Sequence, residues 1–142
     1  ITTSMGDIND FKKLQVDLAI VTDVCHNTNT PGMNKSKDGN VAGGKGPVFE
    51  FTAQNHRKVI QHLRNVADLN EIPYQLSVGS YGNDTVAFFL ENTPTAILST
   101  PLKYMHTTVE MVHIERYVKN GNMLYIITVI LVMGGQFALH IS

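Results

Sequence analysis

The sequence predicts an α/β domain in which helices cover both faces of a mixed β-sheet. Short runs rich in β-branched and aromatic residues alternate along the chain with segments whose apolar residues recur at helical spacing. That alternation is typical of α/β folds. The composition agrees, because 43% hydrophobic and 16% charged residues are ordinary values for a folded domain. A chain of 142 residues is long enough for one hydrophobic core.

The first half of the chain is expected to hold two strands and a helix. The apolar run 18–21 predicts a strand buried on both faces that ends at Asp23. The polar and glycine-rich residues 27–46 predict a long loop. Residues 48–51 predict a second strand, and apolar residues at helical spacing predict a helix over 54–70.

The second half is expected to continue the alternation. Residues 74–78 predict a strand, 79–84 a second loop and 85–91 a short helix. Residues 96–99 predict another strand, which Pro101 stops. A last helix is expected from near Val112 towards Val132, although Gly121 weakens it. Its apolar stretch 123–133 is too short to span a bilayer, which needs about 20 apolar residues.

Charge and cysteine content exclude several classes of function. A formal net charge of -1 provides no basic surface for nucleic acid. The single cysteine, Cys25, cannot form an internal disulfide, which favours the reducing cytoplasm. The polar N-terminus lacks a secretory signal. Because natural chains begin with Met, the Ile1 start indicates processing or a boundary within a longer protein.

Asp23 is the first candidate for chemistry. A carboxylate at the end of a buried strand either caps a turn, the commoner case, or faces a metal ion. Cys25 and His26 follow it, but no second cysteine completes a thiolate zinc site, so we interpret Cys25 as a packed residue.

His106 is the second candidate, although its local sequence is that of an ordinary surface histidine. The other histidines have no comparable setting, and we interpret them as solvated or structural: His56, His62, His113 and His140. The glycines around Lys45 do not form a phosphate-binding loop, because no Ser or Thr follows the lysine.

Six segments occur in an order that matches one family, and they are DLAIVTDVCH (17–26), TPG (30–32), GKGP (44–47), IPYQ (72–75), GNDT (82–85) and YMHTTVE (104–110). Together they closely resemble the cobalt- or zinc-dependent aminopeptidases. That family includes glutamyl aminopeptidases, deblocking aminopeptidases and the TET peptidases, and some members carry the name endoglucanase. The resemblance extends from about Asp17 to Val118.

The resemblance implies a di-metal site. In the family two divalent ions, zinc or cobalt, share a bridging aspartate and a bound water, and a glutamate acts as general base. The aspartate that matches Asp23 binds one ion, and the histidine that matches His106 binds the other. Carboxylates and imidazoles are suitable ligands for both metals.

Other residues are implied to support that site. Glu110 and Tyr104 would orient the imidazole of the histidine ligand, and His26 would lie beside the site. Asp84 would lie near the N-terminal residue of the substrate, although Asn83 stands where the family often has Gly or Thr.

The family's first metal histidine, bridging aspartate and glutamate pair all precede the position of Asp23. Residues 1–7 contain no Glu. We therefore expect residues 1–142 to be the C-terminal portion of a metallopeptidase catalytic domain, with the upstream half and an inserted assembly domain absent. No catalytic general base is then expected in this chain, which alone would be inactive. The alternative is that Thr3 and Ser4 replace the pair and that activity is lost.

The sequence therefore predicts, for the full-length protein, a cytoplasmic aminopeptidase that removes N-terminal residues from peptides. It is expected to form a large homo-oligomer such as a dodecamer and to have no nucleic-acid or membrane partner. One alternative is a catalytically inactive relative, or a scaffold or assembly protein, with the same fold. A less favoured alternative is an endoglucanase, which requires two carboxylates about 5–9.5 Å apart around a glycosidic bond.

Overall fold

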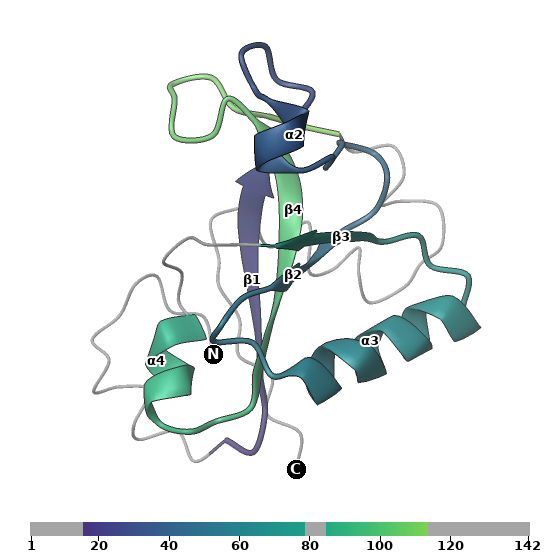
Figure 1. Cartoon of the computed structure of the whole chain (residues 1–142), viewed down its shortest axis with the longest axis vertical. Helices are drawn as coiled ribbons and strands as arrows, with labels where there is room; N and C mark the ends of the chain where they lie inside the picture. Colours follow the sequence, from purple (N-terminus) through teal and green to yellow (C-terminus); the bar gives the residue numbers. More distant parts are fainter. Residues whose placement is uncertain (1–15, 79–84, 114–142) are drawn as a thin grey trace.

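A five-stranded mixed sheet forms the centre of the computed structural model, which describes residues 16–78 and 85–113 (Figure 1). The strands are β1 (Ala19–His26), β2 (Val48–Phe51), β3 (Gln75–Val78), β4 (Thr95–Lys103) and β5 (Met111–Val112). The helices are α2 (Lys35–Asp38), α3 (Arg57–Leu69) and α4 (Thr85–Leu90). The predicted α/β class and mixed sheet are confirmed.

The pairing of the strands places β4 in the middle of the sheet. The order is β1-β4-β2-β3, and β5 pairs with β4 outside this path. β1 runs parallel to β4 over its whole length, and β2 runs parallel to β3. β2 and β5 are antiparallel to β4. Because β1 and β4 are parallel, their carboxyl ends meet at the same edge of the sheet, where α/β folds carry their sites.

Two strands extend further than the sequence predicted. Asp23 does not end β1 but lies inside it, because β4 provides a pairing partner for every residue as far as His26. β4 continues through Pro101, which lacks a backbone N–H. The proline is tolerated because it lies between the β4 residues that pair with β2 and those that pair with β5, where neither of these strands requires a donor.

The segment that was predicted to begin the C-terminal helix forms a short strand. Met111 and Val112 form β5 and pair with Lys103 and Leu102. The rest of that predicted helix and the apolar stretch 123–133 lie outside the described residues. Among the residues that the structure describes, no helix has the length and apolar character needed to cross a membrane.

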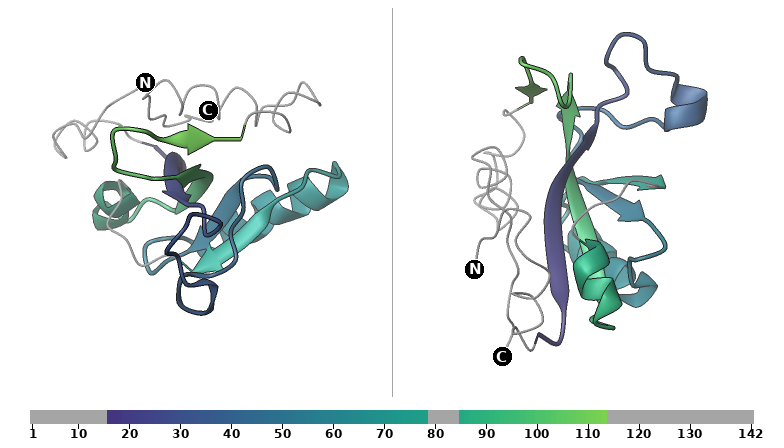
Figure 2. Two further views of the ribbon diagram at one scale, coloured as in Figure 1. Left: turned by 90° about the horizontal axis from the view of Figure 1, so that it is seen from above. Right: turned by 90° about the vertical axis from the view of Figure 1, so that its left-hand side faces the viewer.

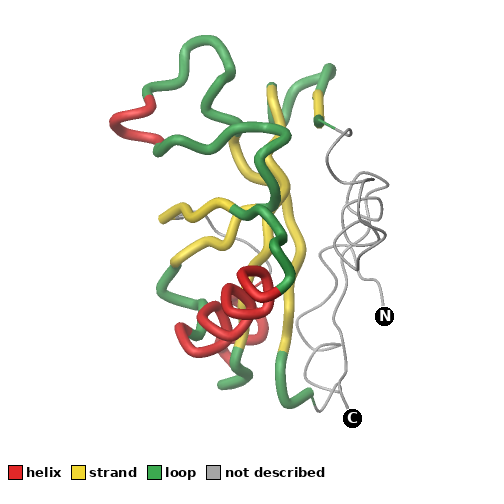
Figure 3. Tube along the Cα trace, turned by 90° about the vertical axis from the view of Figure 1, so that its right-hand side faces the viewer, coloured by secondary structure: helices red, strands yellow, loops and turns green. Residues whose placement is uncertain are grey.

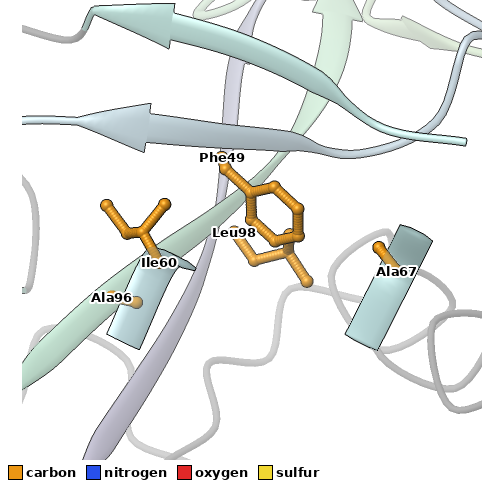
Figure 4. Packing of buried hydrophobic residues seen from close by; sticks show 5 residues of the cluster. All are labelled: Phe49, Ile60, Ala67, Ala96 and Leu98. Atoms are coloured by element: carbon orange, nitrogen blue, oxygen red, sulfur yellow. The ribbon is translucent and has the colours of Figure 1, made fainter. Parts of the chain in front are cut away.

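The helices cover opposite faces of the central strands, as predicted. Ile60 and Ala67 lie seven residues apart on one side of α3, and they pack against Phe49, Ala96 and Leu98 (Figure 4). The other helix, α4, packs Phe88 against a second cluster, formed by Ala19, Val21 and Ile97. Since Ala96 and Ile97 are neighbours in β4, they point to opposite faces. In Figure 1 and in the left-hand view of Figure 2, α3 and α4 accordingly lie on opposite sides of the β1–β4 pair.

The segment between β1 and β2 is loop except for α2 (Figure 3). Its return to the sheet is held by one side chain of β3. The Gln75 amide donates hydrogen bonds to the carbonyls of Ala42 and Gly46, both at 2.9 Å, and accepts one from the Ala42 N–H at 2.8 Å. This side chain therefore fixes the chain just before β2 enters the sheet.

Candidate functional site

A row of polar residues crosses one face of the sheet. The β1–β4 register pairs Asp23 with Ser99, which also pairs with Val48 of β2. Glu50 follows Val48 by two residues and therefore points to the same face, and it pairs with Ser77 of β3. Pairing between distant strands thus brings two carboxylates and two hydroxyls together.

Glu50 is the most deeply buried acid in this row, with 5% of its surface exposed. Burial raises the pKa of its carboxyl group, and the nearby negative charge of Asp23 raises the pKa further, whereas Ser99 opposes the rise. The Ser99 hydroxyl therefore lies beside Glu50, although its oxygen makes no hydrogen bond of standard distance and angle with the described residues. The fold thus holds Glu50 in a place that disfavours its charged form.

Cys25 is a neighbour of both acids. It follows Asp23 by two residues, so the two side chains lie on the same face of β1. Burial raises the pKa of the Cys25 thiol, and the charges of Glu50 and Asp23 raise it further. The cysteine therefore remains a thiol at neutral pH. This agrees with its interpretation as a packed residue.

Asp23 is half-buried, and its carboxylate is oriented by its own strand. One oxygen, Oδ1, accepts a hydrogen bond from the Val24 backbone N–H at 2.7 Å. A carboxylate offers about four acceptor positions. This bond is therefore compatible with coordination of a metal ion by the same group.

His106 lies in a strained turn just after β4. Its φ is 65° and that of Tyr104 is 57°, so both residues occupy the left-handed region that L-residues avoid. The Thr107 N–H closes the turn by donating to the Tyr104 carbonyl at 3.1 Å. The His106 backbone N–H donates to Oε1 of Glu110 at 2.8 Å. Such strain persists where the surroundings impose it, and it clusters at functional sites.

The predicted supporting residues are placed as follows. Glu110 accepts a hydrogen bond from the His106 backbone N–H, so it holds the turn that carries this histidine. Tyr104 is exposed in the same turn. His26 is the last residue of β1, opposite Leu102. Asp84 lies outside the described residues.

Of the remaining histidines, His56 and His62 are exposed, as expected of solvated residues. His113 packs against Gly43 and Gly44, where an added Cβ would lie within 3.4 Å of it, so it has a structural contact. His140 lies outside the described residues.

The two proposed metal ligands approach the same edge of the sheet from parallel strands. Asp23 lies three positions before the end of β1, which is about 10 Å at the usual strand rise of about 3.3 Å per residue. The loop that follows β4 lies at that edge (Figure 1), and His106 belongs to this loop, between β4 and β5. Among the described residues, no group of three or more His, Cys, Asp or Glu side chains is arranged to hold a metal ion.

A cavity of about 470 Å³ adjoins the polar row. Cys25 and His26 of β1 and Glu50 of β2 line it, and α2 and β3 contribute further walls. Local sequence patterns did not predict a role for Glu50 or Ser99. The available signal was a single acid in the otherwise apolar strand VFEF, since an acid is seldom buried without a specific role.

Comparison with known proteins places the chain in a family. A lysyl aminopeptidase of Pyrococcus furiosus is 36% identical in a 72-residue alignment that covers 48% of this chain and 21% of that protein. The TET1 peptidase of Pyrococcus horikoshii, which can assemble into a tetrahedron or a large octahedral shell, is 28% identical with a TM-score of 0.55. That match covers 82% of this chain and 32% of the TET1 chain.

The fold similarity extends to PhTET1-12s, solved as a dodecamer. It has a TM-score of 0.63 at 23% identity, and the match covers 89% of this chain and 36% of that one. The chain thus spans about a third or less of the length of the relatives it matches. The sequence profile of the M42 glutamyl aminopeptidases matches residues 5–123. Because that match covers most of the sequence, the chain belongs to the M42 glutamyl aminopeptidase family.

Proposed function

We propose that this chain is part of a metal-dependent aminopeptidase and that Asp23 and His106 bind neighbouring divalent ions. The observation that supports this most strongly is the strained turn at His106. The fold holds a non-glycine residue at φ 65° and anchors it through Glu110, at the edge where β1 and β4 both end. Positioning of the His106 imidazole for a ligand accounts for that strain.

The donor groups suit the metals. An oriented carboxylate and an exposed imidazole match the preference of zinc or cobalt for oxygen and nitrogen ligands. When bound, a pair of such ions polarises the peptide carbonyl and lowers the pKa of the attacking water. In this proposal Asp23 holds one ion, and Glu110 keeps the 104–107 turn in place. The general-base glutamate and the bridging aspartate come from outside residues 1–142, which form the C-terminal portion of the catalytic domain.

The complete protein, meaning the natural chain that contains these residues, would act on the N-termini of peptides. We infer a cytoplasmic location from the single cysteine, which fits a reducing compartment, and a homo-oligomer by analogy with the assemblies of TET1. The rival function is that of a non-catalytic relative that keeps the scaffold. An endoglucanase is less well supported, because the matching family model and the lysyl aminopeptidase relative both indicate a peptidase.

The test compares two histidine variants of the complete protein. His106→Ala should lower kcat/KM for an aminoacyl-nitroanilide by at least about a hundredfold and should reduce bound metal from two ions towards one. His62→Ala is the matched control, because His62 is exposed on α3 and its removal should change stability by no more than about 0.5 kcal/mol. Equal activity and equal metal content in the two variants would remove His106 from the site.

A second measurement separates this proposal from the non-catalytic rival. The 142-residue chain by itself should not hydrolyse the nitroanilide even with added zinc or cobalt, since general-base catalysis alone contributes about 10²–10⁴-fold. The complete protein should hydrolyse it and should bind about two ions per subunit after chelation and re-addition. A complete protein that binds neither ion would favour the non-catalytic relative.

A further inference from the structure

The turn that carries His106 has a defined type. The Thr107 N–H donates to the Tyr104 carbonyl at 3.1 Å, which is the bond between the fourth and first residues of a β-turn. His106 is the third residue of this turn and has a φ of 65°, whereas Met105, the second residue, has no positive φ. That combination defines a type II turn, whose third position usually holds Gly or Asn. Further bonds are therefore needed to hold a histidine there.

The peptide group between Met105 and His106 distinguishes this turn from the commoner type I turn. A flip of that peptide would reverse the direction of the His106 N–H and would give His106 a negative φ. Oε1 of Glu110 accepts a hydrogen bond from this N–H at 2.8 Å and so holds the peptide in the type II orientation. The backbone from which the imidazole extends therefore depends on where the Glu110 carboxylate lies.

The Thr107 hydroxyl connects the turn to the backbone that leads into Glu110. Its oxygen lies 2.7 Å from the Tyr104 carbonyl oxygen and 3.0 Å from the Val109 carbonyl oxygen, and its one proton can be donated to either. The same oxygen accepts a hydrogen bond from the Val109 N–H at 3.3 Å. One side chain thus joins the first residue of the turn to the residue that precedes Glu110.

We propose that Thr107 is a positioning residue for the metal site. Its hydroxyl keeps the Glu110 carboxylate against the His106 N–H and so fixes the turn from which the imidazole binds its ion. The inference rests on the proposed function, in which His106 is a metal ligand, and it adds a residue that prepares this ligand before the metal arrives. A turn that can flip is competent for part of the time only, and the apparent metal affinity falls by that fraction.

The test measures metal binding by the complete protein, stripped of metal by chelation, with no substrate present. Thr107→Val replaces the hydroxyl with a methyl group. In zinc titrations against a competing chelator, this variant should bind one of its two ions about threefold to tenfold more weakly than the wild type does. That range is expected for one hydrogen bond in contact with water. Unchanged affinity for both ions would overturn the proposal.

Two further variants assign the effect to the hydroxyl. Thr107→Ser keeps the hydroxyl and should restore the wild-type affinity for both ions. Thr108→Val is the matched control, because it makes the same change at the neighbouring exposed threonine, whose hydroxyl takes no part in the bonds described above. It should bind both ions as the wild type does. A loss of affinity in Thr108→Val as large as that in Thr107→Val would contradict a specific role for Thr107.

Urea unfolding of the metal-free protein separates positioning from general stability. Thr107 is exposed, so Thr107→Val and Thr108→Val should unfold at the same urea concentration. Weaker metal binding together with unfolding of Thr107→Val at a lower urea concentration than Thr108→Val would indicate a loss of stability and would overturn the positioning role.

The outcomes also distinguish this proposal from the one on which it rests. If His106→Ala binds both ions as tightly as the wild type, the proposed metal site is wrong. If His106→Ala loses one ion while Thr107→Val keeps both affinities, the metal site stands and the role of Thr107 is refuted.

Discussion

Gln75→Ala should destabilise the protein, because this one side chain holds the loop that leads into β2. Its amide makes three hydrogen bonds of 2.8–2.9 Å with Ala42 and Gly46, both of which are buried. A net contribution of about 0.5–1.5 kcal/mol for each bond gives roughly 1.5–4.5 kcal/mol. Gln75 itself is half-buried, so water can enter the vacated space and satisfy part of the loss. We therefore expect about 1.5–3 kcal/mol.

The assay is urea unfolding followed by circular dichroism, since the chain contains no Trp for fluorescence. Gln61→Ala is the matched control, because Gln61 is exposed on α3 and bonds one side chain, that of Asn65. It should change the free energy of unfolding by no more than about 0.5 kcal/mol. Gln75→Glu keeps the acceptor but loses both donors, so it should be at least as destabilising as the alanine at neutral pH. A Gln75→Ala effect no larger than that of Gln61→Ala would refute the reasoning.

Three further substitutions test the core, a turn and the buried acid. Ile60→Ala should lower the free energy of unfolding by about 2–5 kcal/mol, because the side chain is 1% exposed, and a smaller loss in urea unfolding would contradict the packing described. Gly46→Ala should lower the free energy of unfolding by more than the roughly 1–2 kcal/mol that a left-handed residue costs, since the φ of Gly46 is 93° and the new Cβ would collide with the Pro73 carbonyl oxygen. Wild-type stability in this variant would show that the backbone can move. Burial raises the pKa of Glu50 above its usual 4.5, so the folded state binds its proton more tightly and stability is lost as pH rises from 4.5 through the folded pKa. In metal-free protein the free energy of unfolding of Glu50→Gln should therefore rise relative to that of the wild type between pH 4.5 and pH 7. A difference in the free energy of unfolding that stays constant with pH would count against a buried carboxyl.

Local patterns in the sequence determined most of the secondary structure. The helical spacing of Ile60 and Ala67 predicted α3, and the apolar run 18–21 predicted β1, because periodicity reports which side of an element is buried. The strand ends were predicted less well. β1 and β4 extend past Asp23 and Pro101 because each strand provides the other's hydrogen-bond partners, and that pairing joins residues about 76 positions apart, as with Asp23 and Ser99.

For the site, the sequence by itself suggested Asp23 and His106 as metal ligands, and it did so through family motifs, since their local patterns alone favoured a turn cap and a surface histidine. The strained turn at His106 became visible only in the structure, because φ depends on the bonds that Glu110 and Thr107 make with it. Glu50 was not identified at all. Its importance arises from register: β2 brings it beside Asp23 and Cys25, which precede it in the chain by 27 and 25 residues and belong to another strand. Residue type and spacing describe each strand separately, whereas the neighbours of a buried acid are decided by which strands pair and where, and only the tertiary structure determines that.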